Sequence, residues 1–157
     1  MGQQELSRIK EVFSKLNIPV KYFEHVAVIT SQDASRTRGI ELHQGIKAIV
    51  LTNEIEFVVI DIPADKKVDT KKVATVLNWS KNKTRMATHE EVLNITGCEI
   101  GAVPPFGHKE KLTILVDKEI YTNKENAFNI GLRTHSVQVP TEEMKKVFEE
   151  LKVTEGD

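Results

Sequence analysis

The segment from Gly101 to His108, with the sequence GAVPPFGH, is the part of the chain whose residue types most directly suggest chemistry. Two adjacent prolines stiffen its backbone, and the glycines permit positive φ angles and close approach by another molecule. Backbone N–H groups held outward by such a loop can bind an anion or stabilise an oxyanion. The alternative is a rigid connector in which Phe106 fills the core. The residue pattern leaves both interpretations open.

Lys47 is the second unusual feature, because it stands inside the otherwise apolar stretch GIKAIVL. Removing an ammonium group from water is costly unless the group is paired or reaches a polar cavity. The alternative is that Lys47 lies on an edge strand and extends its ammonium group to solvent. Spacing alone does not decide between a functional and a solvated lysine.

Several familiar catalytic patterns are absent from the sequence. It contains no G-x-S-x-G nucleophile turn, no H-E-x-x-H zinc motif and no G-x-x-x-x-G-K-[ST] phosphate loop. The five histidines are at least 18 residues apart, so no local pair predicts a metal site. Cys98 is the only cysteine, and a lone thiol of this kind is typical of core packing. We therefore expect neither a metal nor a cofactor.

Helices and strands of recognisable pattern surround these residues. Apolar residues recur at helical spacing near the N-terminus, and this helix is predicted to stop at Asn17 and Pro19. Residues 46–51 and 55–60 are rich in β-branched side chains and predict a hairpin. Both segments are apolar at nearly every position, which favours cover on both of their faces.

Two further helices are predicted to begin at Asp69 and Thr88. Thr88 and Glu91 form a capping-box pattern, and Gly97 is suited to end that helix in a left-handed conformation. A last helix opens at Thr141. Further short strands are predicted at 22–23, 26–29, 112–116, 120–121 and 136–139. Strands and helices that interleave without regular spacing favour a mixed α/β (α+β) fold.

The composition is that of one globular domain over residues 1–157, with 39% apolar and 29% charged residues. The N-terminus carries charges where a signal peptide would be apolar, and no apolar run exceeds four residues. Together with the single cysteine, this predicts a cytoplasmic protein without a membrane partner. The net charge of −1 argues against a DNA-binding protein.

The charges are unevenly distributed along the chain. Residues 65–85 carry seven cations and two acids, whereas residues 142–157 carry six acids and three cations. A local excess of positive charge can bind a phosphate backbone even when the remaining surface repels it. The alternative is an ordinary lysine-rich helix exposed to solvent.

Five short motifs occur along the chain in one order. They are Lys47 in GIKAIVL, the R-x-A-T-x-E-E-V run at 85–92, Thr96-Gly97, GAVPPFG at 101–107 and Val116-Asp117. No single motif is diagnostic, but the ordered set is specific. With the match extending from about Tyr22 to Met144, most of the chain, it resembles the YbaK family, which is related to the editing domain inserted in bacterial prolyl-tRNA synthetases.

The resemblance implies a free-standing deacylase that removes misattached amino acids from tRNA. It also implies a mixed, partly barrel-like central sheet surrounded by helices. Lys47 would anchor the 3′ end of the tRNA, and the loop that starts at Gly101 would supply backbone contacts to the ester; these are the expected catalytic residues. The expected substrate-binding residues are His25, Thr30, Ala102, Val103, Pro105, Phe106 and Gly107. The expected partners are mischarged tRNA and an aminoacyl-tRNA synthetase.

Two positions depart from the pattern of other family members. Some relatives carry a second glycine where this chain has Ala102, and others carry Ser-Pro where it has Pro104-Pro105. Substrate preference therefore does not transfer by resemblance. The Ala102 departure also keeps open a non-catalytic module that binds tRNA or a synthetase, and an enzyme for other small acyl esters is a third reading.

Overall fold

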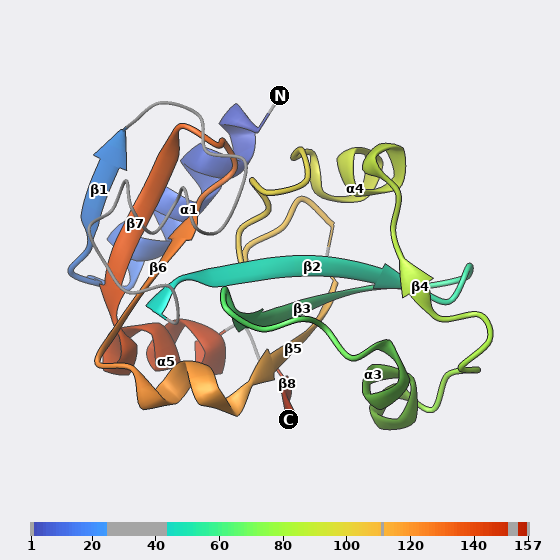
Figure 1. Ribbon diagram of the computed structural model, residues 1–157. Helices are drawn as coiled ribbons and strands as arrows, with labels where there is room; N and C mark the ends of the chain where they lie inside the picture. The colour runs from blue at the N-terminus through green and yellow to red at the C-terminus, as the bar shows by residue number, and fades with distance from the viewer. Residues whose placement is uncertain (1, 25–43, 111, 151–153, 157) are drawn as a thin grey trace.

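The computed structural model describes residues 2–24, 44–110, 112–150 and 154–156 (Figure 1). Its helices are α1 (Gln3–Lys15), α3 (Thr70–Leu77), α4 (His89–Thr96) and α5 (Thr141–Glu150), with a 3-10 helix, η2 (Lys118–Thr122). Its strands are β1 (Lys21–Glu24), β2 (Ile46–Thr52), β3 (Phe57–Pro63), β4 (Arg85–Met86), β5 (Thr113–Asp117), β6 (Glu125–Asn129), β7 (His135–Pro140) and β8 (Thr154–Gly156). The expected mixed α/β class is confirmed. None of the described helices combines the length and the apolar content needed to cross a membrane.

The strands form two sheets. The order in the larger sheet is β4-β2-β3-β5-β8, with β3 and β5 parallel, and the smaller sheet has the order β1-β7-β6. An isolated parallel bridge from Gly45 to Ala127 connects them. The expected partly closed barrel is therefore replaced, among the described strands, by two sheets that meet at this bridge.

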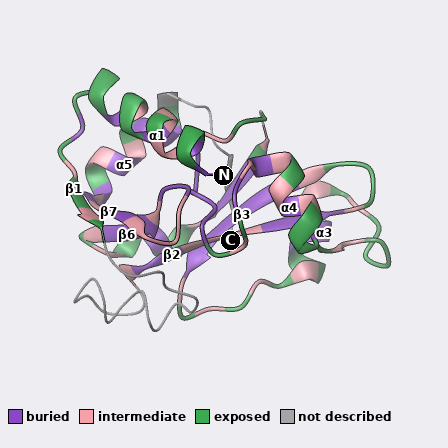
Figure 2. Cartoon of the chain, turned by 90° about the horizontal axis from the view of Figure 1, so that it is seen from above, coloured by how far each residue is buried: buried purple, intermediate pink, exposed green. Residues whose placement is uncertain are grey.

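The β2–β3 hairpin is covered on both faces, as its apolar sequence predicts. Because side chains alternate along a strand, Val59 faces one hydrophobic cluster while Val58 and Ile60 face another. Helix α4 packs on the first face through Val92, and α3 packs on the second through Val73. Figure 1 shows the two helices on opposite sides of the hairpin, and Figure 2 shows that the strands of the hairpin are largely buried.

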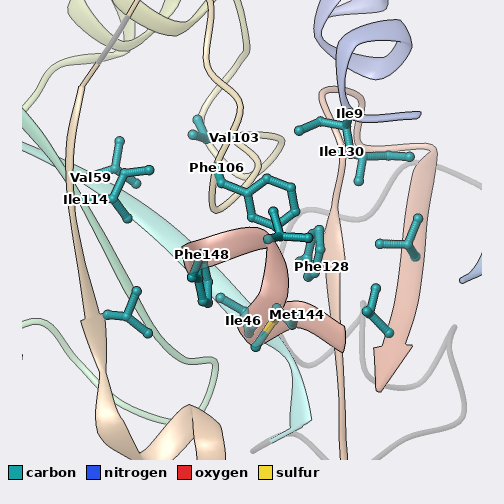
Figure 3. Packing of buried hydrophobic residues seen from close by; sticks show 14 of the residues in the cluster. Ile9, Ile46, Val59, Val103, Phe106, Ile114, Phe128, Ile130, Met144 and Phe148 are labelled. Carbon is teal, nitrogen blue, oxygen red and sulfur yellow. The ribbon is translucent and has the colours of Figure 1, made fainter. Parts of the chain in front are cut away.

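The larger cluster is centred on aromatic rings. Phe106 is fully buried and makes edge-to-face contacts with Phe13, Phe128 and Phe148, with ring centroids 5.6–5.8 Å apart. Figure 3 shows the Phe106 ring in the middle of this group. Such pairs add about 0.5–1.5 kcal/mol each beyond the area that they bury. The packing attaches the loop that carries Phe106 to α1, β6 and α5.

The helix ends follow the chemistry of the sequence. Asp69 accepts a hydrogen bond from the backbone N–H of Lys72 at 3.1 Å and begins α3. Thr88 and Glu91 form the expected capping box of α4, and Gly97 ends the helix at φ 75°. These contacts satisfy N–H groups that have no partner inside a helix.

Two local expectations are wrong. Strand β3 begins at Phe57 rather than at residue 55, because Asn53 accepts the backbone N–H groups of residues 55 and 56 and extends the turn. Residues 120–121 lie in η2 rather than in a strand. Asp117 accepts the N–H of Glu119 at 2.9 Å, so the chain turns immediately after β5.

Asp61 is an exception in the apolar hairpin. Its side chain is fully buried, and neither carboxylate oxygen has a hydrogen-bond partner in the part of the chain that the structure describes. Burial raises the pKa of this carboxyl group well above its ordinary value, because the charged form loses its hydration. In the unfolded chain the group ionises freely. Folding at neutral pH therefore requires the uptake of a proton, and this cost grows as the pH rises above the pKa of the unfolded chain.

We predict that Asp61→Val stabilises the protein at pH 7 by about 1–3 kcal/mol, the usual cost of an unsatisfied buried polar group. The gain should shrink toward pH 4, where the unfolded carboxyl group also binds a proton. Denaturant unfolding at the two pH values measures both effects.

Thr52→Val is the matched control. Thr52 is also fully buried, but its hydroxyl donates to the carbonyl of Glu56 at 2.7 Å and accepts from the N–H of Glu54 at 3.0 Å. This variant should lose stability. An Asp61→Val protein that loses stability at pH 7 would contradict the prediction.

Candidate active site

The loop at Gly101 begins with a tight turn. The N–H of Ala102 donates to the carbonyl of Glu99 at 2.9 Å, and Gly101 lies at the corner with φ 90°. A Cβ atom at Gly101 would meet only the Nε of Arg133, at an ordinary 3.5 Å. The backbone angle, rather than lack of space, is therefore what requires glycine here. Gly101 itself is exposed.

The connection between β6 and β7 holds three consecutive carbonyl groups of this turn. Arg133 donates from Nε and Nη2 to the carbonyl of Ile100, with Nε at 3.0 Å. Asn129 donates its side-chain amide to the carbonyl of Gly101. The N–H of Gly131 donates to the carbonyl of Ala102 at 3.0 Å. The turn is thus fixed from one side at every peptide unit.

This arrangement determines where the N–H groups of the turn point. In a trans peptide the N–H points away from the carbonyl of the preceding residue. Because the carbonyls of Ile100 and Ala102 face the β6–β7 connection, the N–H groups of Gly101 and Val103 face away from it. Neither N–H donates a hydrogen bond to any of the described residues. Two oriented donors are the chemistry that an oxyanion site needs.

The rest of the loop is anchored in the core. Ala102, Val103, Pro105 and Phe106 are buried, and only Gly107 is partly exposed among the later residues predicted to bind substrate. The side chain of Phe106 therefore fills the core, as the alternative interpretation of this segment proposed. Any contact of these four residues with a substrate would come from their backbone atoms.

His108 closes the loop. Its Nε2 lies 2.6 Å from the carbonyl of Pro104, so Nε2 carries the proton and donates it. Burial of the ring lowers the pKa of His108 to about 4; the hydrogen bond to Pro104 opposes this shift, and the charge of Arg8 adds to it. His108 is thus a neutral donor that holds the proline segment.

Lys47 is half-buried on β2. Ile46 and Val50 face the larger cluster, so the alternation along the strand directs Lys47 to the other face, on the same side as Ile49 and Leu51. Burial lowers the pKa of its ammonium group; Asp65 opposes the shift, and Lys67 adds to it. Within the described part of the chain, the ammonium group forms no salt bridge.

The structure separates Lys47 from the buried side chains of the loop but brings its strand close to the turn. Val103 and Phe106 lie on the opposite face of β2 from the Lys47 side chain. The bridge between Gly45 and Ala127, however, places the start of β2 beside β6. Lys47 and Asn129 each lie two residues beyond that bridge in the parallel direction. Asn129 in turn contacts the carbonyl of Gly101.

Two of the predicted substrate-binding residues, His25 and Thr30, fall outside the described residues. Arg133 and Asn129, which hold the turn, were missed by sequence reasoning, because nothing in their local pattern distinguishes them from other polar loop residues.

Two surface hollows in the described structure contain neither Lys47 nor Gly101. One is lined by α1 residues, and the other lies between α3 and the larger sheet.

Cys98 is suited to packing rather than to nucleophilic chemistry. It is fully buried, and burial raises the pKa of its thiol to about 12, with the charge of Glu5 adding to the shift. A thiol that stays protonated at neutral pH is a poor nucleophile. Within the described ranges, no three histidine, cysteine or acidic side chains gather in a metal-binding arrangement.

Comparison with known proteins identifies the class of this chain. Residues 25–147 match the family model of the aminoacyl-tRNA editing domain, and this match includes both Lys47 and the Gly101 loop. The chain belongs to this family, whose members hydrolyse aminoacyl-tRNA, and it is therefore an enzyme of the aminoacyl-tRNA deacylase class.

Two curated relatives are similar to this chain in sequence. A Multifunctional Ser/Thr-tRNA deacylase ProXp-y from Escherichia coli strain K12 is 29% identical, covering 93% of this chain and 89% of that protein. A proline–tRNA ligase from Bacillus cytotoxicus is 27% identical over 74% of this chain, but the match spans only 21% of the ligase.

The solved structures support the fold alone, because their sequence identities are low. A protein described as a proposed trans-editing enzyme for prolyl tRNA synthetase has a TM-score of 0.80 at 21% identity, covering 98% of this chain and 95% of its own. The hypothetical protein APE2540 has a TM-score of 0.84 at 17% identity, covering 96% and 97% respectively.

We predict that the His108 imidazole stays neutral down to about pH 4. Between pH 6.5 and 4 the unfolded chain binds a proton at this residue that the folded chain does not, so stability should fall as the pH falls through that window. NMR titration of the ring and denaturant unfolding at stepped pH values measure the two effects.

His108→Gln keeps a side-chain donor and assigns the ring resonance. It should also remove the share of the pH dependence that comes from this ring. A His108 ring that titrates near pH 6.5 in the folded protein would contradict the prediction.

Proposed function

We propose that the protein hydrolyses the ester between a misattached amino acid and the 3′ end of tRNA, with water as the attacking group. The observation that carries this proposal is the Gly101 turn, whose carbonyls are held on one side while two of its N–H groups have no partner among the described residues. Family membership supports tRNA as the substrate. The E. coli relative is named for Ser/Thr-tRNA, so seryl and threonyl esters are the first substrates to test.

The turn would act on the developing negative charge. When water attacks the ester carbonyl, its oxygen becomes an oxyanion, and the N–H groups of Gly101 and Val103 are the proposed donors to it. Each such donor is worth about 100- to 1,000-fold in rate. An aminoacyl ester is already activated, so positioning together with oxyanion stabilisation suffices without a nucleophilic side chain.

Lys47 would supply the fixed charge for the tRNA end. An ammonium group that is half-buried and has no salt bridge among the described residues can neutralise a phosphate at little cost in lost contacts. Burial lowers the pKa of the Lys47 ammonium group, and a phosphate bound nearby would raise this pKa again, because an opposite charge favours the charged form. The Gly45–Ala127 bridge brings the start of β2 beside β6, whose Asn129 holds the turn. This closeness of the two backbones supports a common site at that end of the hairpin, with the Lys47 side chain reaching it from the other face of β2.

The remaining predicted residues have supporting places in this proposal. Ala102, Val103, Pro105 and Phe106 would set the shape and stiffness of the loop from within the core. Gly107 would leave its backbone accessible at the far end of the loop. His25 and Thr30 stay proposed substrate contacts at the entrance to the site.

A non-catalytic module that binds tRNA or a synthetase is the second candidate. One observation favours it: the N–H of Ala102 is already donated to Glu99, so the central peptide of the turn offers no donor to a ligand. The match to 21% of a proline–tRNA ligase supports association with such enzymes in general terms.

We predict that Lys47→Ala lowers deacylation by at least about 100-fold while the protein stays folded, because the residue is polar and only half-buried. A panel of mischarged tRNAs, with seryl- and threonyl-tRNA first, measures ester loss directly.

Lys47→Arg is the control that keeps the charge and should retain part of the activity. Unchanged turnover by Lys47→Ala would overturn the role given to this residue. Binding without turnover by the wild-type protein across the panel would favour the binding module. Turnover of free aminoacyl esters at the same rate as tRNA esters would favour an enzyme for other small acyl esters.

We also predict that Arg133→Ala lowers kcat about 10- to 100-fold with a smaller effect on KM, because the turn loses the group that fixes the Ile100 carbonyl. Arg133→Lys should recover only part of the rate, since one ammonium group cannot reproduce the fork of donors.

Lys146→Ala, which removes an exposed ion pair with Glu143 on α5, is the matched control and should leave kcat unchanged. Equal kcat values for Arg133→Ala and the wild-type protein would contradict a positioning role.

A further inference from the structure

We propose that α3 and its flanking segments form a docking surface for the sugar-phosphate backbone of RNA, next to the candidate active site. We call this the lysine surface, and its members are Lys67, Lys71, Lys72, Lys81 and Lys83. The inference rests on the proposed function, because it places the body of the tRNA whose 3′ end the site would hold.

The structure separates the cations of residues 65–85 into two groups. Lys66 contacts Asp117 at 3.2 Å and Glu119 at 2.8 Å, and Arg85 pairs with both carboxylate oxygens of Glu91. The charges of Lys66 and Arg85 are therefore used in ion pairs within the folded protein. The five members of the lysine surface are exposed and form no ion pair with the described residues. The sequence alone could not make this distinction.

The lysine surface adjoins Lys47. Helix α3 packs through Val73 on the same face of the larger sheet to which Lys47 points, whereas the buried loop residues occupy the other face. Lys67 is close enough to repel the Lys47 ammonium group, with Asp65 as the nearby acid that opposes this effect. Lys47 and α3 thus lie on the same face of the larger sheet, with Lys67 close to Lys47.

The charges on α3 are badly placed for stability. Lys71 and Lys72 lie in the first turn of the helix, where the helix dipole favours negative charge, and that turn contains no acidic residue. The acid that precedes the helix in the sequence, Asp69, accepts the backbone N–H of Lys72 with its carboxylate. A lysine pair that has neither an ion-pair partner among the described residues nor a favourable helix dipole contributes little to folding. A bound polyanion would supply the missing opposite charge.

An RNA backbone fits this surface better than an acidic protein does. Phosphates repeat at regular intervals, and lysines spread over a helix and a following segment can meet several of them at once. The larger part of the molecule does not compete for the RNA, since the net charge is −1 and residues 142–157 are predominantly acidic. The surface would therefore orient the tRNA as well as hold it.

The test compares a double variant, Lys71→Gln with Lys72→Gln, and a second pair, Lys81→Gln with Lys83→Gln. With mischarged tRNA we expect each pair to raise KM about tenfold and to leave kcat unchanged. The plot of log kcat/KM against the logarithm of the salt concentration has a negative slope, and each pair should make this slope shallower by about 1.5. With a CCA trinucleotide carrying the same amino acid, all variants should match the wild-type protein.

Lys145→Gln with Lys146→Gln on α5 is the control, because it removes the same charge from another element. An unchanged KM and an unchanged salt slope in both lysine-surface pairs would overturn the proposal. If the wild-type protein deacylates nothing, the proposed function fails separately. Binding of uncharged tRNA by the same variants then tests the lysine surface. Equal affinity of all variants for this tRNA overturns the proposal, and a loss of affinity confined to the two lysine-surface pairs supports it.

Discussion

The candidate site depends on how one short backbone turn is held. Three successive carbonyl groups, from Ile100 to Ala102, accept hydrogen bonds from Arg133, Asn129 and Gly131. Since each peptide unit is planar, holding the carbonyls also fixes the directions of the N–H groups. The prolines and the Phe106 ring then attach the turn to the core. The chemistry proposed for this protein therefore needs no reactive side chain, only a backbone that cannot relax.

Much of the fold could be predicted from local patterns. The helix that starts at Thr88 was predictable at both ends, because capping box and C-terminal glycine act over a few residues. Strand β6, by contrast, was missed, because ENAFN contains no β-branched residue. Its Asn126 is buried and donates to the carbonyl of Ile120 and to the hydroxyl of Thr141. Such a strand is specified by contacts between distant segments, which no local pattern reveals.

The candidate site was predictable only in part, for the same reason. Gly101 and Lys47 are unusual in their local context, and each can be singled out there. Arg133 and Asn129 gain their importance from residues about 30 positions away. The loop itself was predicted as a whole, yet the side chain of Phe106 proves to pack in the core. Sequence reasoning thus found the segment but could not separate the atoms that face outward from those that anchor it.

The β2–β3 hairpin packs against a separate hydrophobic cluster on each of its faces, and this arrangement affects which amino-acid replacements the protein tolerates. Its strands carry one hydrophobic cluster toward the Gly101 loop and a second toward α3. Because the two clusters lie on opposite faces of the strands, we expect amino-acid replacements in one cluster to disturb the packing of the other cluster less than their own. Recognition of the acyl group and binding of the nucleic acid can therefore evolve separately among homologous proteins with this fold.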